Sequence, residues 1–435
     1  MAAINWTAQI DDMVAGHWVN PETGQPATLP YRSIVIDEDL RGREAELVAG
    51  LSLGGAIGIV CDDATYQAMG ERVARALGAE TVILDHPHAD EAAVADLRDR
   101  TRHFAALVAV GSGTVNDLAK YVTATDGRDY CVFGTAASMN GYTSTTASIT
   151  LRSGLKVSKP AHAPLGVFID LGVNAAAPRH LAAAGFADCL CRSTAQVDWW
   201  LSHRLFGTTY TDLPFALQRG DEPELMSRAK MLPERDVAAF GTLHRVLTLC
   251  GLGVSFTGMS NHGSMGEHQI SHYVDCFAGP LHPGSLHGQQ VGVATLTMAR
   301  LQHRMLAMEA PPVVRPTVVD VDAMRGRYGD AVLLTVLDEL RSKALDAAGA
   351  DALNEELARL WPELRHELLA FTLPVERMRA TLAAAGGPTT AAELGLDVRF
   401  YRQAVQHARE IRRRYSILDL AADAGLLEGF VETEA

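Results

Sequence analysis

The segment FAALVAVGSGTVNDLAKYVTA, residues 104–124, decides the fold class of this chain. Its first residues are apolar and predict a buried strand that runs into Gly111 and Gly113, and the residues that follow have the apolar spacing of a helix. The two glycines allow a ligand to approach the backbone, and the first N–H groups of the helix face that ligand. Such a turn suits the pyrophosphate of a dinucleotide. An ordinary glycine-lined turn between a strand and a helix is the alternative.

The segments around this turn repeat the alternation of strand and helix. Strands joined by helices at this spacing indicate a parallel sheet with crossover connections, which is a Rossmann-like α/β architecture. We expect further strands at 54–62, 81–85, 130–135 and 163–171, and a β-hairpin that turns at Ser153 and Gly154.

The pattern changes near Pro178, after which nearly every segment has a period of 3.6 residues. Helical spacing extends through the last such stretch, residues 400–427, without a predicted interruption. We therefore predict two domains: an α/β domain over residues 1–177 and an all-α domain over residues 178–435.

The composition excludes several classes of protein. The chain has 435 residues, of which 48% are hydrophobic, so it has enough apolar material for a large core. Its net charge of −14 argues against nucleic acid and anionic membranes as partners. The six cysteines form no CxxC motif, and no signal peptide or apolar run of about 18 residues is apparent. We expect a cytoplasmic enzyme with a small-molecule substrate.

Three residues of the second half have side chains that suit a metal ion: Asp188, His268 and His287. One carboxylate and two imidazoles suit Zn²⁺, Fe²⁺ or Ni²⁺ and leave positions for water or substrate. His272 follows His268 by four residues and shares its helix face. Histidines that merely pack in a helical core are the alternative.

Two further groups of polar residues are candidates for cofactor contacts. Asp62 ends a predicted strand, where a carboxylate can accept hydrogen bonds from an adenosine ribose and repels a 2′-phosphate. An N-cap of the next helix is an equally good interpretation. In the segment FGTAASMNGYTSTTASI, Thr135, Ser138 and Asn140 either line a polar pocket or satisfy the backbone of their own loop.

Six motifs in order carry a resemblance to a known family: GSGTVNDLAK, TAASMNGYTSTTASI, SGLKVSKPAHAP, AAGFADCLCRSTAQVDW, SMGEHQISH and LHGQQVGVATL. Together they resemble the sn-glycerol-1-phosphate dehydrogenase family. That family belongs to the superfamily of iron-containing, metal-dependent alcohol dehydrogenases and dehydroquinate synthases. The C-terminal AREIRRRYSILDLAADAGLL resembles the bacterial AraM branch.

The resemblance implies an NAD(P)-binding N-terminal domain and a metal-binding helical C-terminal domain, the dehydroquinate synthase-like fold, in a homodimer or higher homo-oligomer. It implies a metal held by Asp188, His268 and His287, and a substrate phosphate near Lys156, for which an exposed hairpin lysine is the alternative. His272 is a candidate proton relay or a support for a metal ligand. The residues implied at the cofactor are Asp62, Gly111, Ser112, Gly113, Asp117, Thr135 and Ser138.

Two of the departures from the family pattern bear directly on the substrate. Asn140 stands where the family usually has a substrate-contacting Asp, and Asn261 stands where it usually has Arg. Asn140 keeps hydrogen bonding but lacks the charge, and Asn261 lacks a guanidinium that would bind phosphate.

The expected reaction is the reversible, NAD(P)H-linked reduction of dihydroxyacetone phosphate to sn-glycerol 1-phosphate. The first alternative is a metal-dependent dehydrogenase of another small alcohol, polyol or hydroxy acid. A dehydroquinate synthase-like cyclase and a non-catalytic binding protein on the same fold are further alternatives.

Overall fold

A computed structural model describes residues 5–434, and its contacts divide the chain into two compact units. The first unit comprises Met1–Arg152, Lys156–Cys189 and Asp212–Met259, and the second comprises Ser153–Leu155, Leu190–Thr211 and Ser260–Ala435. Several helices that follow residue 178 therefore belong to the same unit as the residues before it. The domain boundary between residues 177 and 178 stays a proposal.

The first unit is built on a parallel sheet of six strands in the order β1-β8-β5-β4-β2-β3. The strands predicted from the apolar runs are confirmed. β1 was not predicted, because its apolar run, residues 34–36, is only three residues long. The strands are β1 (Ser33–Asp37), β2 (Ile57–Asp62), β3 (Glu80–Leu84), β4 (Ala106–Gly111), β5 (Asp129–Gly134) and β8 (Gly166–Asp170).

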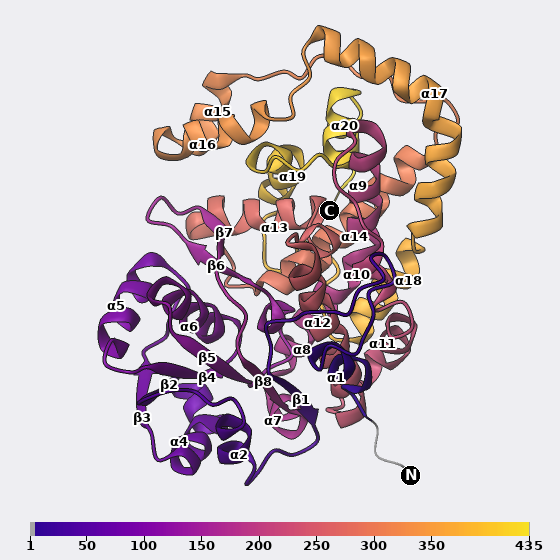
Figure 1. Cartoon of the computed structure of the whole chain (residues 1–435). Coiled ribbons are helices and arrows are strands. Elements are labelled where there is room, and N and C mark those ends of the chain that lie inside the picture. The colour runs from indigo at the N-terminus through magenta and orange to yellow at the C-terminus, as the bar shows by residue number, and fades with distance from the viewer. Residues whose placement is uncertain (1–4, 435) are drawn as a thin grey trace. The chain divides into compact units, whose positions relative to one another are not determined.

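Helices cover both faces of this sheet, as Figure 1 shows. On one face lie α5 (Glu91–Thr101) and α6 (Gly113–Asp126), and on the other lie α2 (Glu44–Ala49) and α4 (Glu71–Leu77). Apolar side chains of the strands alternate toward the two faces, and a cluster that includes Ile59, Val108 and Phe133 fills the face covered by α2 and α4. This doubly covered parallel sheet confirms the Rossmann-like class of the N-terminal part.

The predicted hairpin is present beside the sheet. β6 (Thr146–Thr150) pairs antiparallel with β7 (Lys156–Pro160), and Thr150 lies opposite Lys156 in the register. Gly154 has a φ of +85° in the connecting turn, which is the left-handed conformation that favours glycine.

The remaining helices of the first unit include one that is long and apolar enough to cross a membrane, α12 (Val237–Thr257), but 83% of its apolar window is buried inside the protein. We therefore assign α12 as a core helix.

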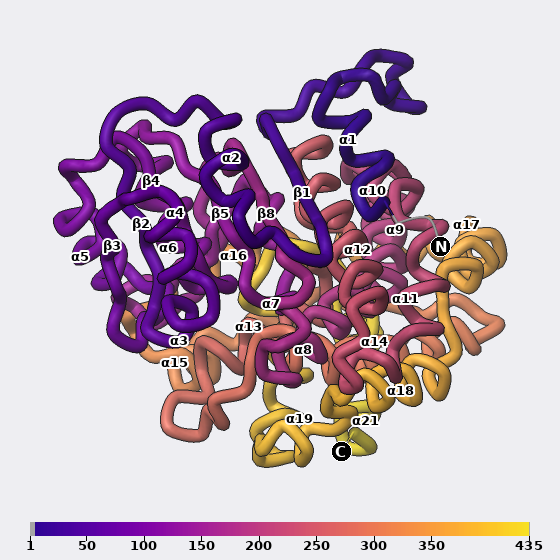
Figure 2. Tube along the Cα trace, turned by 90° about the horizontal axis from the view of Figure 1, so that it is seen from below, coloured from indigo at the N-terminus to yellow at the C-terminus, as the bar shows by residue number. Residues whose placement is uncertain are grey.

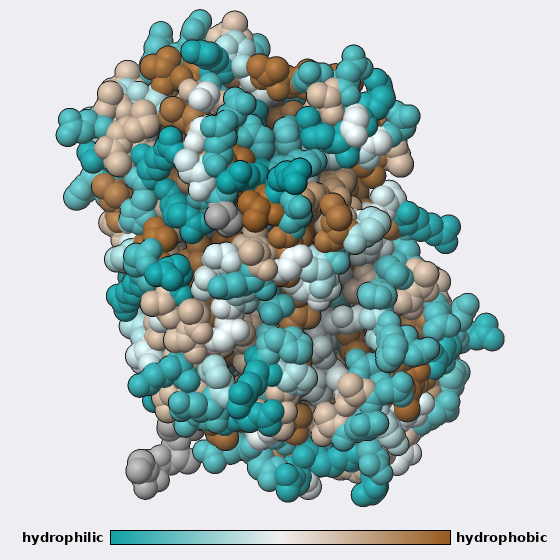
Figure 3. All heavy atoms as spheres, turned by 180° about the vertical axis from the view of Figure 1, so that it is seen from behind, coloured by the Kyte–Doolittle hydropathy of each residue, from teal (hydrophilic) through white to brown (hydrophobic). Residues whose placement is uncertain are grey.

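On the face in Figure 3, hydrophobic residues occur in small groups interrupted by hydrophilic ones. The other helices of this unit are α1 (Ala8–Val14), α3 (Asp63–Thr65), α7 (Leu171–Ala176), α8 (Arg179–Leu190, whose last residue belongs to the second unit), α10 (Leu213–Ala216) and α11 (Glu222–Arg228).

The second unit contains no β-strand within the described residues, which confirms the predicted all-α character. Its core surrounds the buried Trp361 and Tyr401, and α9 lies beside α17 in Figures 1 and 2. Its helices are α9 (Arg192–Phe206), α13 (Gly266–Phe277), α14 (His287–Leu306), α15 (Val321–Tyr328), α16 (Asp330–Arg341), α17 (Ala347–Phe371), α18 (Val375–Ala384), α19 (Val398–His407), α20 (Ile417–Asp423) and α21 (Leu427–Val431).

The uninterrupted helix predicted over residues 400–427 is wrong. After α19 a short 3-10 turn, Ala408–Ile411, ends at Arg412, whose φ of −145° and ψ of 141° are those of extended chain. Ser416 then caps α20 with a capping box to Asp419. The periodicity continued across this break because apolar residues on both sides happen to keep the helical spacing. The break leaves Arg412–Tyr415 in a non-helical segment.

Candidate active site

The predicted cofactor residues of the first unit gather at one edge of the sheet. β4 pairs with β2 on one side and with β5 on the other, and the chain order reverses at this point. In open α/β sheets, ligands bind outside the carboxyl ends of the strands where the order reverses. Asp62, Gly111 and Thr135 all lie at these carboxyl ends. The sheet therefore brings together three segments that sequence reasoning could only place one by one.

The turn between β4 and α6 has the form that anion binding requires. Ser112 is the N-cap of the 14-residue α6, and its side chain makes no capping hydrogen bond. The first N–H groups of the helix therefore lack an intrahelical acceptor. A Cβ on Gly113 would meet only Met139, at 3.4 Å, whereas a Cβ on Gly111 would lie 2.6 Å from Val115. Gly113 thus leaves room for a ligand, and Gly111 is needed for the tight packing of the turn.

Asp62 is the N-cap of α3. Its Oδ1 accepts the N–H of Thr65 at 2.7 Å, and the Thr65 hydroxyl accepts the N–H of Asp62 at 3.0 Å. The N-cap interpretation left open by the sequence is therefore the one that the structure shows. The carboxylate remains half-buried at the carboxyl end of β2.

Asp117 lies within a buried network that ties α6 to the hairpin. Its Oδ2 accepts the N–H of Ser148 at 3.0 Å. Burial raises the pKa of Asp117, while Lys120 and Lys156 act in the opposite direction. Lys120 donates to the carbonyl oxygens of Gly141 and Thr146 at 2.6 and 3.1 Å, and burial lowers its pKa to about 8. The half-buried Lys156 therefore lies close enough for its charge to lower the pKa of Asp117. A hairpin lysine that points into solvent would not have this effect.

The segment after β5 reaches the proposed metal ligand of the first unit. The N–H of Asn140 donates to Asp188 Oδ2 at 3.1 Å, and the side-chain amide of Asn140 lies 3.4 Å from Cys250 Sγ. Asp188 is 4% exposed. Thr135 is buried at the start of this segment, where its N–H donates to the Gly111 carbonyl, and Ser138 is half-buried in the loop. Asn140 therefore orients the Asp188 carboxylate through its backbone.

A glycine on α8 permits this approach. A Cβ on Gly185 would lie 1.9 Å from the carbonyl oxygen of Ala137, so no side chain fits there. Gly185 is one helical turn before Asp188, and Ala137 is three residues before Asn140. The close packing of helix and loop at Gly185 thus sets the position of the Asp188 carboxylate.

Three histidines of the second unit form a cluster. His268 and His272 lie on α13 and His287 begins α14. The ring centroids of His268 and His287 are 5.0 Å apart, and that of His272 is 5.3 Å from His287 and 6.2 Å from His268. The two histidines predicted as metal ligands are therefore brought together although 18 residues separate them in the sequence.

Each predicted histidine ligand is oriented by a hydrogen bond at Nδ1. His268 Nδ1 lies 3.0 Å from Glu267 Oε1, which can only accept, so Nδ1 carries the proton. His287 Nδ1 lies 3.0 Å from the Ser271 hydroxyl, which itself donates to Gln290 Oε1 at 2.9 Å. Both bonds make Nε2 the nitrogen that would coordinate a cation, as is usual for histidines that bind metals.

A buried acidic network supports the start of α13. Glu267 Oε1 also accepts the N–H of Met265 at 2.7 Å, and Asp198 accepts the N–H of Gly266 and of Ile417 at 3.1 Å each. Burial raises the pKa of Asp198 to about 8, with the Glu267 charge as the next cause. This network fixes the backbone from which His268 projects.

The same region holds a second possible donor set. Cys191, Glu267 and His268 offer one donor atom each within 4.8 Å of one another, and all three are buried. This set lies wholly within the second unit and shares His268 with the predicted set.

Comparison with known proteins shows which family this chain belongs to. A family model of iron-containing alcohol dehydrogenases matches residues 35–178. The glycerol-1-phosphate dehydrogenase (NAD(P)+) of Methanoculleus marisnigri is 31% identical over 272 residues, which are 61% of this chain and 74% of that protein. The chain belongs to the glycerol-1-phosphate dehydrogenase family. The relative with that name from Bacillus velezensis is 28% identical over 83% of this chain and 84% of its own length.

Solved structures confirm the fold of this family member. The probable glycerol dehydrogenase of Sinorhizobium meliloti superposes with a TM-score of 0.59 over 93% of this chain and 98% of that chain, at 19% identity. The α/β N-terminal part and the helical C-terminal part predicted from the sequence are thus those of the iron-containing alcohol dehydrogenase superfamily.

Several contacts of the candidate site could not be predicted from the sequence. Glu267 directly precedes His268, but adjacent helical residues are not expected to face one another. Ser271 lies 16 residues before His287, the histidine that it orients. Arg412 donates to His272 Nε2 at 3.2 Å from 140 residues further along the chain. The run of arginines at 412–414 was the available signal, and the helix predicted there concealed it.

Proposed function

We propose that this protein catalyses the reversible, NAD(P)H-linked and metal-dependent reduction of dihydroxyacetone phosphate to sn-glycerol 1-phosphate. The observation that carries the proposal is the pair His268 and His287, whose Nδ1 atoms are both held by hydrogen-bond acceptors while their rings lie 5.0 Å apart. The relatives that match most of the chain are named glycerol-1-phosphate dehydrogenases, which supports the substrate.

We propose Asp188, His268 and His287 as the ligands of one divalent metal ion. The donor set fits, because each side chain is fixed through an atom other than the one that would coordinate: Asp188 by Asn140, His268 by Glu267 and His287 by Ser271. When bound, the metal would polarise the substrate carbonyl and lower the pKa of the product hydroxyl. One carboxylate and two imidazoles suit Zn²⁺, Ni²⁺ and Fe²⁺ alike.

The cofactor is proposed to lie along the edge of the sheet where β2, β4 and β5 end. The unsatisfied N–H groups at the start of α6, with Ser112 and Gly113, would bind its pyrophosphate. Asp62 would receive the adenosine ribose and favour NADH over NADPH. Thr135 and Ser138 would lie beside the nicotinamide half, and Asp117 would act indirectly, because it holds the hairpin against α6.

Three residues are proposed to act on the substrate. Asn140 supplies an amide in place of the acid usual at its position, so it can hold a hydroxyl group but cannot accept a proton. Lys156 contributes a positive charge that is half-buried. His272, which accepts from Arg412 at Nε2, keeps its proton on Nδ1 and can donate it to a substrate oxygen.

The experiment that tests this function is a substrate comparison at the NADH absorbance band. Metal-loaded protein is given dihydroxyacetone phosphate and, separately, unphosphorylated dihydroxyacetone. We expect oxidation of NADH with the phosphate ester and at least about 100-fold lower kcat/KM without it, because charged hydrogen bonds to phosphate are lost. Equal rates with both compounds would refute the proposal.

Asn140 and Asn261 favour a second candidate, a dehydrogenase of an unphosphorylated alcohol or hydroxy acid, because both departures remove charge near the substrate. Higher activity on unphosphorylated substrates would support it. A dehydroquinate synthase-like reaction would instead regenerate its NAD+ and show no net change in NADH. The predicted cytoplasmic location and homo-oligomer remain proposals, and sedimentation of the purified protein tests the latter.

A further inference from the structure

The structure assigns to Arg412 the recognition of the phosphate group of the substrate, in place of the guanidinium that Asn261 lacks. This inference rests on the proposed function and adds a specificity residue that lies outside the six ordered motifs. It starts from three consecutive arginines, Arg412–Arg414, that the break between α19 and α20 places outside any helix.

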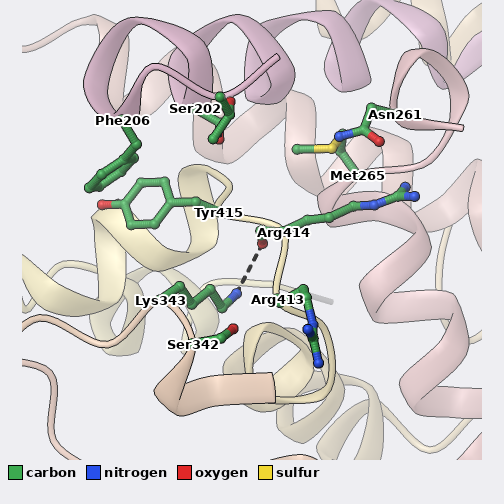
Figure 4. A pocket seen from close by; sticks show the side chains of 10 residues that line it. Ser202, Phe206, Asn261, Met265, Ser342, Lys343, Arg413, Arg414 and Tyr415 are labelled. Carbon is green, nitrogen blue, oxygen red and sulfur yellow. Dashed lines mark hydrogen bonds between the residues drawn. The ribbon is translucent and has the colours of Figure 1, made fainter. Parts of the chain in front are cut away.

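The three arginines are used in different ways. Arg413 is exposed and pairs with Glu339 at 3.0 Å and with Asp338 at 3.2 Å. Arg414 donates to the Ser260 hydroxyl at 2.9 Å and to the Ser264 carbonyl, so it braces the short loop that carries Asn261. Figure 4 shows the Arg414 side chain extending toward Asn261 and Met265 along the wall of a pocket.

Arg412 differs from its two neighbours because most of its donors are not used. Within the described residues, its guanidinium makes one hydrogen bond, to His272 Nε2, and no ion pair with a carboxylate. A guanidinium has five N–H donors. Burial lowers the pKa of Arg412, while the charges of Cys276 and Glu339 act in the opposite direction. Burial and then the charge of Arg412 lower the pKa of Arg414, so two cations lie close together here. A partly buried cation that pairs directly with no carboxylate is costly unless an anion joins it.

The position of Arg412 identifies the anion. His272 links Arg412 to the cluster in which His268 and His287 are the proposed metal ligands. A three-carbon substrate whose carbonyl lies at the metal would carry its phosphate past His272. In a chain with a net charge of −14, this pair of arginines is a local positive region that suits a phosphate monoester.

The test compares Arg412→Ala and Arg412→Lys with Arg413→Ala, a neighbouring exposed arginine, as the matched control. Circular dichroism and metal content first establish that each variant is folded and loaded. We expect Arg412→Ala to lower kcat/KM for dihydroxyacetone phosphate by roughly 10- to 100-fold, mainly through KM. The value for unphosphorylated dihydroxyacetone should change less than about twofold, and Arg412→Lys should recover part of the loss.

A second readout is independent of turnover. Calorimetric titration with inorganic phosphate should show the affinity of Arg412→Ala reduced by a similar factor and that of Arg413→Ala unchanged. If Arg412→Ala lost kcat/KM equally on both substrates, or bound inorganic phosphate as tightly as the wild type, the assignment would be overturned. So would a changed ratio of NADPH to NADH activity, which would assign Arg412 to the phosphate of the cofactor. If the wild type does not reduce dihydroxyacetone phosphate, the proposed function fails, and the phosphate titration still decides the role of Arg412.

Discussion

Gly185→Ala would separate the helix that carries Asp188 from the loop that carries Asn140. The added methyl carbon would lie 1.9 Å from the Ala137 carbonyl oxygen and 3.3 Å from Leu247 Cδ1. Ordinary contact distances are about 3.5 Å, so helix or loop must shift by more than about 1 Å. The Asn140–Asp188 hydrogen bond, 3.1 Å long, cannot keep its length through such a shift unless both elements move together.

The expected cost follows from the nature of the clash. Overpacking usually costs 1–3 kcal/mol, and here the obstacle is backbone, which cannot rotate away, so we expect about 3 kcal/mol. Urea denaturation followed by circular dichroism measures this loss. Because the Asp188 carboxylate loses its orienting bond, we also expect metal affinity to fall by roughly 10- to 100-fold, measured by competition with a chelator.

Gly220→Ala is the matched control, because a Cβ at Gly220 would meet nothing within 4 Å. It should change stability by less than about 0.5 kcal/mol. A Gly185→Ala protein that unfolds at the same urea concentration as the wild type and binds metal equally well would refute the claim that this close packing positions Asp188.

Three further predictions concern other parts of the site. His268→Ala and His287→Ala should each lose bound metal and lower turnover by more than about 100-fold, whereas Ser271→Ala, which removes only the partner of His287, should lose about tenfold. Metal analysis and NADH assays would contradict this if either alanine variant stayed active when metal-free. Burial lowers the pKa of Lys120 from 10.5 to about 8, so between these pH values the unfolded chain keeps a proton that the folded chain has released. This group therefore makes stability rise with pH over that range, by roughly 3 kcal/mol in all. About 1.4 kcal/mol of this rise falls between pH 7 and 9, and it should be absent in Lys120→Met when urea titrations at these two pH values are compared. Asp62→Ala removes an N-cap and should cost about 1 kcal/mol. It should also raise the KM for NADH and lower that for NADPH, and an unchanged cofactor preference would leave Asp62 with the capping role alone.

The sequence was sufficient to predict the parts of this molecule that depend on local periodicity and on strand-to-helix turns. The apolar run before Gly111 predicted β4, and the spacing after Gly113 predicted α6, because both signals lie within a few residues. β1 was missed because its apolar run of three residues is too short to predict a strand. The helix predicted across residues 400–427 failed because apolar spacing does not reveal that Ser416 begins a new helix.

The candidate site was predictable in its residue types but not in its contacts. Asp188, His268 and His287 were selected by chemistry and by resemblance, and the structure supplies the hydrogen bonds that orient each of them. Arg412 could not be connected with His272 in advance, because tertiary packing alone brings residues so distant in the sequence together. Asp62 shows the reverse case, in which a local motif had two interpretations: the structure contains the N-cap, and the contact with the cofactor ribose stays a proposal.

The most direct test of the central claim is a metal titration of the chelator-treated protein. Zn²⁺, Ni²⁺ or Fe²⁺ is added in steps, the last under anaerobic conditions, and NADH oxidation by dihydroxyacetone phosphate is recorded at each step. One ligand set per chain predicts that activity rises linearly and stops at one equivalent of the effective metal per chain. Full activity in the metal-free protein, or no activity with any of the three metals, would contradict the account.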